Sequence, residues 1–188
     1  ANEWQDPQNY ASTGRATVLT QIGIMDGEGQ ILRPGARGEI VLAGDLVMAG
    51  YYKMPDKTAE TIIDGWLHTG DIGYIDSRGY VFIKDRIRDL VVTGGFNVYP
   101  SDVEAVLGRH PAVRECVVFG VDDEKWGEAV HAAVELHYGA ATSADDIISF
   151  VKQHLDSVKA PKMVHITKEL PRSAVGKILR RAAKDLFG

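Results

Sequence analysis

The sequence has 188 residues, of which 45% are hydrophobic and 25% charged, with a formal net charge of −5. This length suits one domain or two small ones, and this apolar content excludes a disordered chain. The acidic balance argues against a general nucleic-acid or anionic-membrane binder, although a few local cations could hold a small anionic ligand. No apolar run reaches the roughly 20 residues that a membrane-spanning helix needs.

The single cysteine, Cys116, excludes an internal disulfide framework and predicts a small buried side chain in an apolar strand. Residues 1–6 have neither the basic start nor the apolar stretch of a signal peptide. Both features favour the reducing cytoplasm, with peripheral membrane association left open.

The amino-terminal half is typical of β-structure, because short apolar runs alternate with turn signals. Two of these signals are Asp-Gly at residues 26–27 and Pro-Gly at residues 34–35. The expected elements are strands at 17–24, 30–32, 39–42, 74–76 and 80–83, and a short helix at 55–63. We therefore expect a β-rich, barrel-like subdomain.

The carboxyl-terminal half changes to helical periodicity. Ser101 and Glu104 fit a capping box at the start of a helix, and another helix follows Ser143. The other expected elements are strands at 116–121, 130–136 and 163–166, and a terminal helix at 177–187. The fold class is therefore α+β: a β-rich subdomain over residues 1–86 and a small α+β domain over residues 87–188.

Two clusters in the first half and at the boundary could carry chemistry. Asp71 follows Thr-Gly, where a carboxylate could accept hydrogen bonds from a ribose diol, or could cap a loop amide. Residues 84–89 are charged except for Ile87, as in a half-exposed strand that leaves a sheet.

Two further clusters lie in the second half. Gly94 and Gly95 allow close approach of the backbone to a ligand, or form a plain hairpin turn. Gly176-Lys177 resembles the end of a phosphate-binding loop, but Pro171 and Ile178 stand where that motif needs glycine and a hydroxyl. Lys177 is therefore either an inserted point charge or part of a helix start. The histidine spacing predicts no metal site.

The residues of these motifs and the order in which they occur resemble the C-terminal third of the enzymes of the adenylate-forming superfamily. This superfamily contains acyl-CoA ligases, luciferases and peptide-synthetase adenylation domains. The motifs that carry the resemblance are residues 44–52, 64–71, 85–100 and 171–181. Residues 64–71 running into 85–86 look like the fatty acyl-CoA synthetase signature. Residues 95–100 look more like those of acyl-CoA ligases than those of peptide-synthetase domains.

The resemblance implies a two-step reaction. A carboxylic acid and ATP form an acyl-adenylate and pyrophosphate, and CoA then displaces AMP to form a thioester. By motif match, Asp71 and Arg86 would bind the ribose of ATP or AMP, and Lys177 would reach the substrate carboxylate and the α-phosphate. Arg88 falls at the hinge position, where this family commonly has Asp or Lys.

The second step implies a different surface. The small domain would swing about the hinge, so that Lys177 withdraws and Gly94 and Gly95 come beside the pantetheine of CoA. Trp126 matches an aromatic position that can stack on the CoA adenine; the alternative is a tryptophan that packs in a loop.

The family's phosphate-binding loop, adenine pocket, magnesium ligands and acyl tunnel have no counterpart in this sequence. We therefore expect a fragment of a longer enzyme, inactive without the missing N-terminal portion. Its partners would be ATP, CoA, Mg²⁺ and a carboxylic acid, most consistent with a fatty acid; a homodimer stays open, and no nucleic acid is expected. The alternatives are an adenylation domain that loads a carrier protein and a non-catalytic interaction module.

Overall fold

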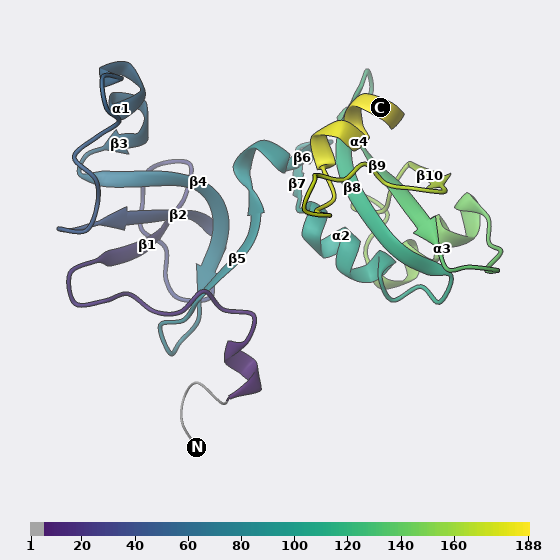
Figure 1. Ribbon diagram of the computed structural model, residues 1–188, viewed down its shortest axis with the longest axis horizontal. Helices are drawn as coiled ribbons and strands as arrows, with labels where there is room; N and C mark the ends of the chain where they lie inside the picture. The colour runs from purple at the N-terminus through teal and green to yellow at the C-terminus, as the bar shows by residue number, and fades with distance from the viewer. Residues whose placement is uncertain (1–5) are drawn as a thin grey trace. The chain divides into compact units, whose positions relative to one another are not determined.

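The computed structural model describes residues 6–188 and divides the chain into two compact units, Ala1–Arg88 and Asp89–Gly188 (Figure 1). This division lies two residues beyond the boundary expected after Arg86. The absence of signal-peptide features was inferred from residues 1–6, and residues 1–5 of this stretch lie outside the described residues. The fold class is α+β, as expected.

The first unit is a curled antiparallel sheet with the strand order β1-β2-β4-β3, in which β5 also pairs with β4. Its strands are β1 (Gln21–Met25), β2 (Gly38–Ala43), β3 (Ile62–Ile63), β4 (Trp66–Ile75) and β5 (Val81–Arg86). A 3-10 turn, η2 (Pro7–Asn9), and the helix α1 (Pro55–Thr61) complete the unit. Ile24, Ile40 and Val81 form its buried core.

Strand β4 produces the curl of this sheet. Its register shifts against β2 between Glu39 and Val41, and against β5 between Ile72 and Gly73, and such bulges bend a strand. At Gly73 a side chain would begin 2.4 Å from the Phe82 carbonyl oxygen, so only glycine fits there. The bent strand pairs with β2 over residues 67–73 and with β5 over residues 71–75, so the two pairings overlap at its centre.

Four expectations for this unit were wrong in detail. The first strand begins at Gln21 rather than at residue 17, and Val18 is fully exposed. Residues 30–32 form a single bridge, Met25 to Ile31, rather than a strand. The helix ends at Thr61, because the chain turns at once into β3. Strand β4 begins eight residues earlier than the strand expected at 74–76, since the chain pairs with β2 there.

The second unit is a five-stranded sheet with the order β10-β9-β6-β7, in which β8 also pairs with β9. Its strands are β6 (Val91–Thr93), β7 (Phe96–Val98), β8 (Val113–Asp123), β9 (Gly127–Leu136) and β10 (Met163–Thr167). Its helices are α2 (Pro100–Leu107), α3 (Ala144–His154) and α4 (Arg180–Phe187), and the 3-10 turn η3 (Ile87–Asp89) crosses the unit boundary. Strand β10 runs parallel to β9.

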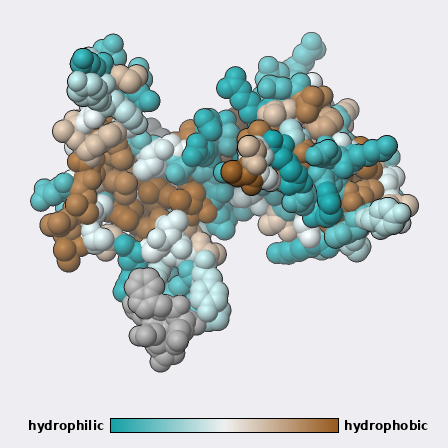
Figure 2. Space-filling model, viewed as in Figure 1, coloured by the Kyte–Doolittle hydropathy of each residue, from teal (hydrophilic) through white to brown (hydrophobic). Residues whose placement is uncertain are grey.

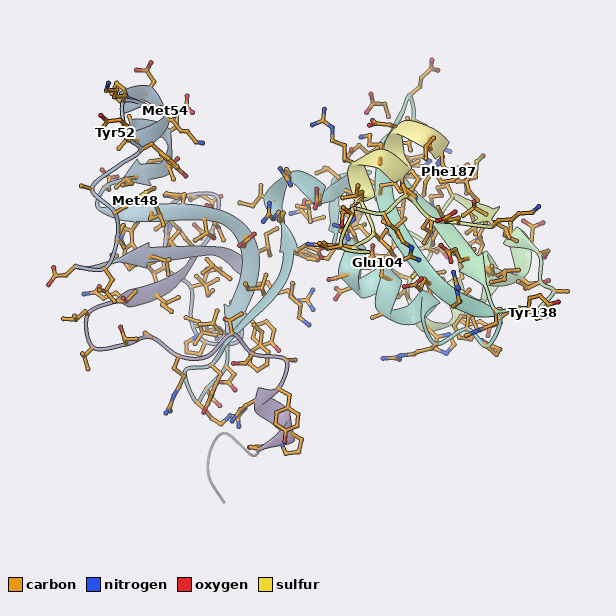
Figure 3. The ribbon with its side chains drawn as sticks, in the orientation of Figure 1. Met48, Tyr52, Met54, Glu104, Tyr138 and Phe187 are labelled. Carbon is orange, nitrogen blue, oxygen red and sulfur yellow. The ribbon has the colours of Figure 1, made fainter. Side chains whose placement is uncertain are left out.

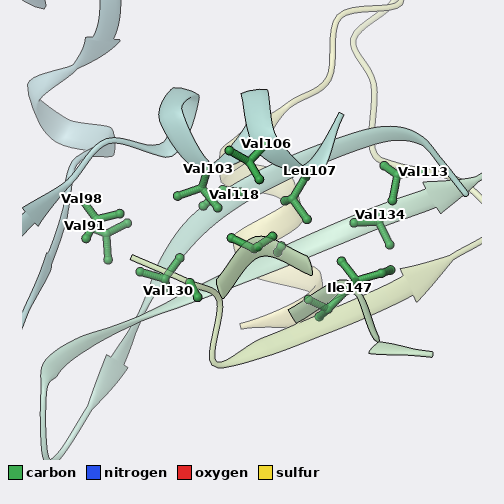
Figure 4. Close-up of a cluster of buried hydrophobic side chains, with 14 residues drawn as sticks. Val91, Val98, Val103, Val106, Leu107, Val113, Val118, Val130, Val134 and Ile147 are labelled. Atoms are coloured by element: carbon green, nitrogen blue, oxygen red, sulfur yellow. The ribbon is translucent and has the colours of Figure 1, made fainter. Parts of the chain in front are cut away.

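Both faces of this sheet are covered, which explains the almost continuous apolar runs of β8 and β9. Val118 packs with Leu107 of α2 and Ile147 of α3 on one face (Figure 4). Its neighbours Val117 and Phe119 point to the opposite face and pack with Ala183 of α4 and with Leu170.

Two helix starts differ from those expected. Pro100 occupies the first position of α2, so Ser101 lies inside the helix, and the N-cap is Tyr99 without a side-chain cap. Glu104 accepts a hydrogen bond from the Val118 amide at 2.8 Å instead of closing a capping box. The second unit does contain a capping box, at the start of α3, where Ser143 caps the helix. Helix α4 begins at Arg180 rather than at residue 177.

Two histidines lie side by side on the face that α4 covers. His131 of β9 and His165 of β10 are 3.5 Å apart between Nδ1 and Nε2, and the His165 ring stacks on Phe187. Figure 3 places Phe187 at the end of α4. Burial lowers the pKa of both rings, and for His131 the neighbouring imidazole lowers it further while Asp123 opposes the shift.

These lowered pKa values predict a pH-dependent stability. At a pH between the folded-state and ordinary pKa values, the unfolded chain binds more protons than the folded chain. The stabilisation from the two neutral rings is therefore fully present above about pH 6.5 and is lost as the pH falls through the folded-state pKa values. We expect the melting temperature to fall between pH 7.5 and 5.5, and to fall less in His165→Gln. The exposed His137→Gln serves as the control. An identical fall in the His165 variant and the parent chain would contradict this expectation.

Candidate functional site

Asp71 and Arg86 are direct partners across the β4–β5 pair. Arg86 Nε lies 3.3 Å from Asp71 Oδ1, and the two side chains are 57% and 27% exposed. Residues that face each other in an antiparallel pair project from the same side of the sheet. The structure thus joins the two residues expected to bind nucleotide into one solvent-accessible ion pair, whose carboxylate can still accept hydrogen bonds from a diol.

A hydrogen-bond network holds the strand that carries Asp71. Glu39 of β2 contacts His68 Nδ1 at 2.7 Å and accepts a hydrogen bond from the Gly70 amide at 2.9 Å. The Thr69 hydroxyl donates to the Ile40 carbonyl and accepts from the Asp71 amide. Asp71 therefore lies within a strand, not after the expected Thr-Gly turn. The sequence reasoning missed Glu39, whose only signal is an acidic residue next to an apolar run.

Arg88 lies in η3, directly before the division between the two units. The next residue, Asp89, is bound to the second unit, because Arg180 Nη1 lies 3.0 Å from its Oδ2 atom. Arg180 also reaches Glu104 of α2 at 2.9 Å, and Figure 3 labels Glu104 on that helix. The connection between the units is thus short and anchored on one side.

Gly94 and Gly95 form the turn of the β6–β7 hairpin, with φ angles of +56° and +81° that favour glycine at both positions. The Gly94 amide donates to the Trp126 carbonyl oxygen at 2.8 Å, and a side chain at Gly94 would begin 3.1 Å from the indole. The hairpin turn and Trp126 therefore lie in direct contact, which the sequence alone did not predict.

Two lysines accompany this tryptophan. Lys125 Nζ lies 4.8 Å and Lys162 Nζ 5.6 Å from the Trp126 ring centre, and the indole is 39% exposed. We call Gly94, Gly95, Trp126 and these two lysines the glycine–tryptophan surface. An exposed aromatic face flanked by cations, next to a backbone without side chains, suits a thin chain that carries a ring and phosphates.

Lys177 lies near the tip of a small hairpin formed by residues 171–179, and its side chain is exposed. The hairpin closes through a bridge between Arg172 and Ile178 and a hydrogen bond from the Leu179 amide to the Pro171 carbonyl. The Lys177 amide donates to the Ser173 hydroxyl at 3.1 Å. Lys177 is therefore not part of a helix start, and its ammonium group is presented by a defined turn.

An ionic cluster around one buried carboxylate lies at the base of this hairpin. Glu135 of β9, 1% exposed, contacts Arg172 at 3.1 Å and also contacts Arg114. Arg172 makes a second ion pair with Glu115, which lowers the pKa of that carboxyl. Sequence reasoning missed this cluster, although an acidic residue inside the apolar run of β9 was a usable signal.

The part of the chain that the structure describes, residues 6–188, was also compared with what a metal site, a membrane-spanning helix and a reactive thiol require. In this part of the chain no three His, Cys, Asp or Glu side chains are grouped as a metal site would require. The described helices include none long and apolar enough to cross a membrane. Burial raises the pKa of the Cys116 thiol to about 12, so it is a poor nucleophile at neutral pH.

Comparison with known proteins identifies the family. Residues 102–177 match the AMP-binding enzyme C-terminal domain. The fatty acid–[acyl-carrier-protein] ligase ScoC of Streptomyces coeruleorubidus is 50% identical over 87% of this chain and 32% of its own length. The medium/long-chain-fatty-acid–CoA ligase FadD8 of Mycobacterium tuberculosis is 42% identical over 97% of this chain and 33% of its own length. The chain belongs to the adenylate-forming superfamily.

A solved structure of the adenylate-forming superfamily has the same fold. ATP-bound MatB from Rhodopseudomonas palustris is 37% identical and superposes with a TM-score of 0.86 over 95% of this chain and 37% of that protein. The chain thus spans about a third of the length of these relatives. Trp126 and Lys177 fall within the residues that match the family model, and Lys177 is the last of them. Asp71, Arg86, Arg88, Gly94 and Gly95 precede the match.

Proposed function

We propose that this chain is the C-terminal portion of an ATP-dependent acyl-CoA synthetase that acts on a fatty acid. A carboxylate oxygen of the acid attacks the α-phosphorus of ATP, and pyrophosphate leaves. The sulfur of CoA then attacks the acyl carbon, and AMP leaves with the oxygen that came from the acid. The observation that carries the proposal is the exposed Lys177, presented by a braced hairpin at the end of the AMP-binding C-terminal domain match.

Lys177 would serve the first step. Adenylation brings a carboxylate against a phosphate, so repulsion and developing charge must be offset by a cation aimed at the reacting groups. An exposed ammonium group on a separate unit can supply that charge and then withdraw. Arg88, in the turn between the units, would be the hinge about which the second unit moves.

Asp71 and Arg86 would hold the nucleotide. The partly exposed carboxylate of Asp71 would accept hydrogen bonds from the two ribose hydroxyls, while Arg86 fixes that carboxylate from one side and contacts the same ribose. The hydrogen bonds that Glu39 and Thr69 accept from the Gly70 and Asp71 amides keep Asp71 in place without using its carboxylate.

The glycine–tryptophan surface would serve the second step. The turn at Gly94 and Gly95 would run alongside the pantetheine, because its backbone carries no side chains to keep a thin chain away. Trp126 would stack on the adenine of CoA. The ammonium groups of Lys125 and Lys162, which lie near the indole, give this surface the charge that a phosphorylated ligand needs.

The rest of the site would lie in a longer protein that contains this chain. The phosphate-binding loop, the adenine pocket, the magnesium ligands and the acyl tunnel belong to that N-terminal portion, and we expect residues 1–188 alone to form no acyl-adenylate. Apolar side chains exposed on the first unit support such a partner portion. Met48, Tyr52 and Met54 are 39%, 86% and 49% exposed (Figure 3), and Figure 2 shows a band of apolar residues on that unit. We place the enzyme in the cytoplasm.

A second candidate is an enzyme that passes the acyl group to a carrier protein, and the likeness to the ligase ScoC favours it. Both acceptors present a pantetheine thiol, but only CoA brings an adenine. The test supplies purified acyl-adenylate to the longer protein with either CoA or a pantetheinylated carrier. The CoA synthetase proposal predicts thioester formation with CoA and a loss of it in Trp126→Ala. Transfer to the carrier alone would favour the second candidate.

Nucleotide affinity tests the proposal at Asp71. In the longer protein, Asp71→Asn should weaken ATP binding by about 10-fold or more, because a hydrogen bond to a charged group contributes more than a neutral one. Asp26→Asn, at an exposed turn of the same unit, is the matched control. Isothermal titration calorimetry gives both values. No measurable ATP binding by the unmutated protein would instead favour the non-catalytic interaction module.

A further inference from the structure

Glu135 is a buried residue of the sheet that contacts the base of the Lys177 hairpin. It lies on β9, which pairs with β8 on one side and β10 on the other, and its side chain is 1% exposed. The carboxylate accepts a hydrogen bond from the Leu170 amide at 2.6 Å. It also contacts the guanidinium groups of Arg172 and Arg114. A buried carboxylate in the middle of a sheet that accepts two hydrogen bonds and makes an ion pair with Arg114 has little freedom to move.

Arg172 connects Glu135 to the residue before Lys177. Its Nη2 atom contacts Glu135 and Glu115, while its Nη1 atom donates to the Gly176 carbonyl oxygen at 3.3 Å. That carbonyl belongs to the peptide bond that joins Gly176 to Lys177. The planar guanidinium, which is pre-organised for several hydrogen bonds at once, thus links the sheet to the peptide group directly before Lys177.

Arg114 provides a natural comparison within the same cluster. It contacts Glu135 and lies 4.0 Å from Glu115, so it shares the acidic partners of Arg172. Arg114 contacts these two sheet residues, whereas Arg172 also contacts Gly176 of the hairpin. Variants of the two arginines can therefore distinguish the loss of a charge beside Glu135 from the loss of the contact with the hairpin.

We propose that Arg172 is a positioning residue for Lys177, with Glu135 as its buried anchor. This inference rests on the proposed adenylation role of Lys177. A lysine has a long flexible side chain, so the direction of its backbone determines where the ammonium group can reach. A displacement of about 1 Å at a reacting centre can cost a factor of about 100 in rate. The bond from Arg172 to Gly176 restricts this displacement.

The test measures both half-reactions in the longer protein. ATP–pyrophosphate exchange reports adenylation, and thioester formation from purified acyl-adenylate reports the second step. Arg172→Gln should lower the kcat of adenylation by roughly 10- to 100-fold, with little change in the KM for ATP or in the second step. Arg172→Lys should lose less, because it keeps a charge beside Glu135. Arg114→Gln should retain adenylation within about 3-fold.

Several results would overturn the inference. Equal losses in both half-reactions, or an Arg114→Gln defect as large as that of Arg172→Gln, would reduce Arg172 to a general structural role. If Arg172→Gln does not fold, Arg172→Lys carries the test, and undiminished adenylation in that variant would overturn it. A loss of adenylation in Lys177→Ala without one in the Arg172 variants would overturn this inference alone. Unchanged adenylation in Lys177→Ala would overturn both it and the proposed function.

Discussion

Replacing Lys177 by alanine in the longer protein should slow acyl-adenylate formation by roughly 100-fold or more. The same variant should form thioester from supplied acyl-adenylate at nearly the normal rate. The reason is that the exposed ammonium group offsets charge only while carboxylate and phosphate meet. Once the adenylate exists, the reaction needs a thiol and an unobstructed acyl carbon, and the lysine contributes nothing to that step.

The matched control is Lys152→Ala, which removes an exposed lysine from α3 of the same unit. Rapid-quench measurements of AMP and thioester formation separate the two steps for each variant. The Lys177 variant should also keep its melting temperature, because the hairpin is closed by backbone and Ser173 contacts rather than by the lysine side chain. Equal slowing of both steps would show that Lys177 does not act as a charge specific to adenylation.

Substituting Gly95 by asparagine should have the opposite selectivity. Asparagine adopts a positive φ more readily than most residues, and a side chain at Gly95 meets no neighbouring atom within 4 Å. The turn should therefore survive while its new side chain obstructs the pantetheine path. We expect thioester formation to slow by about 10-fold or more and adenylation to stay within about 2-fold, because a displaced reactant loses its near-attack geometry.

Gly29→Asn controls for the cost of the substitution itself. Gly29 also lies in a turn, has a φ angle of +80° against +81° at Gly95, and likewise has open space around it. The two variants should therefore lose similar stability in thermal unfolding, while only Gly95→Asn slows the thioester step. A thioester rate that is unchanged in Gly95→Asn would remove the turn from the proposed CoA path.

Local patterns in the sequence predicted the parts of the fold that depend on neighbouring residues. The hairpin around residues 77–79 and the strands β8, β9 and β10 of the second sheet follow from apolar runs and turn residues, and the structure contains them. The short strands β6 and β7 were not expected. Predictions from local sequence were wrong where a residue distant in sequence determines the contact. Glu104 fits a capping box by spacing, yet the nearby amide of Val118 and the guanidinium of Arg180 take its carboxylate.

The candidate site shows the same limit. Asp71, Arg86 and Lys177 were found because they stand in motifs, and the structure shows that the first two form an ion pair. The contacts that hold the site were not predictable from spacing. Arg172 meets Glu135, and Gly94 meets Trp126, only after β9 and the β6–β7 hairpin are in place. Such pairs are distant in sequence, and no local periodicity encodes them.

The fate of the carboxylate oxygens tests the proposed chemistry most directly. The longer protein is incubated with ATP, CoA and a fatty acid labelled with oxygen-18 in its carboxylate, and the products are separated and weighed by mass spectrometry. Attack of that carboxylate on the α-phosphorus, followed by attack of the thiol on the acyl carbon, predicts AMP that carries a single labelled oxygen. Unlabelled AMP, or label in pyrophosphate, would contradict the account.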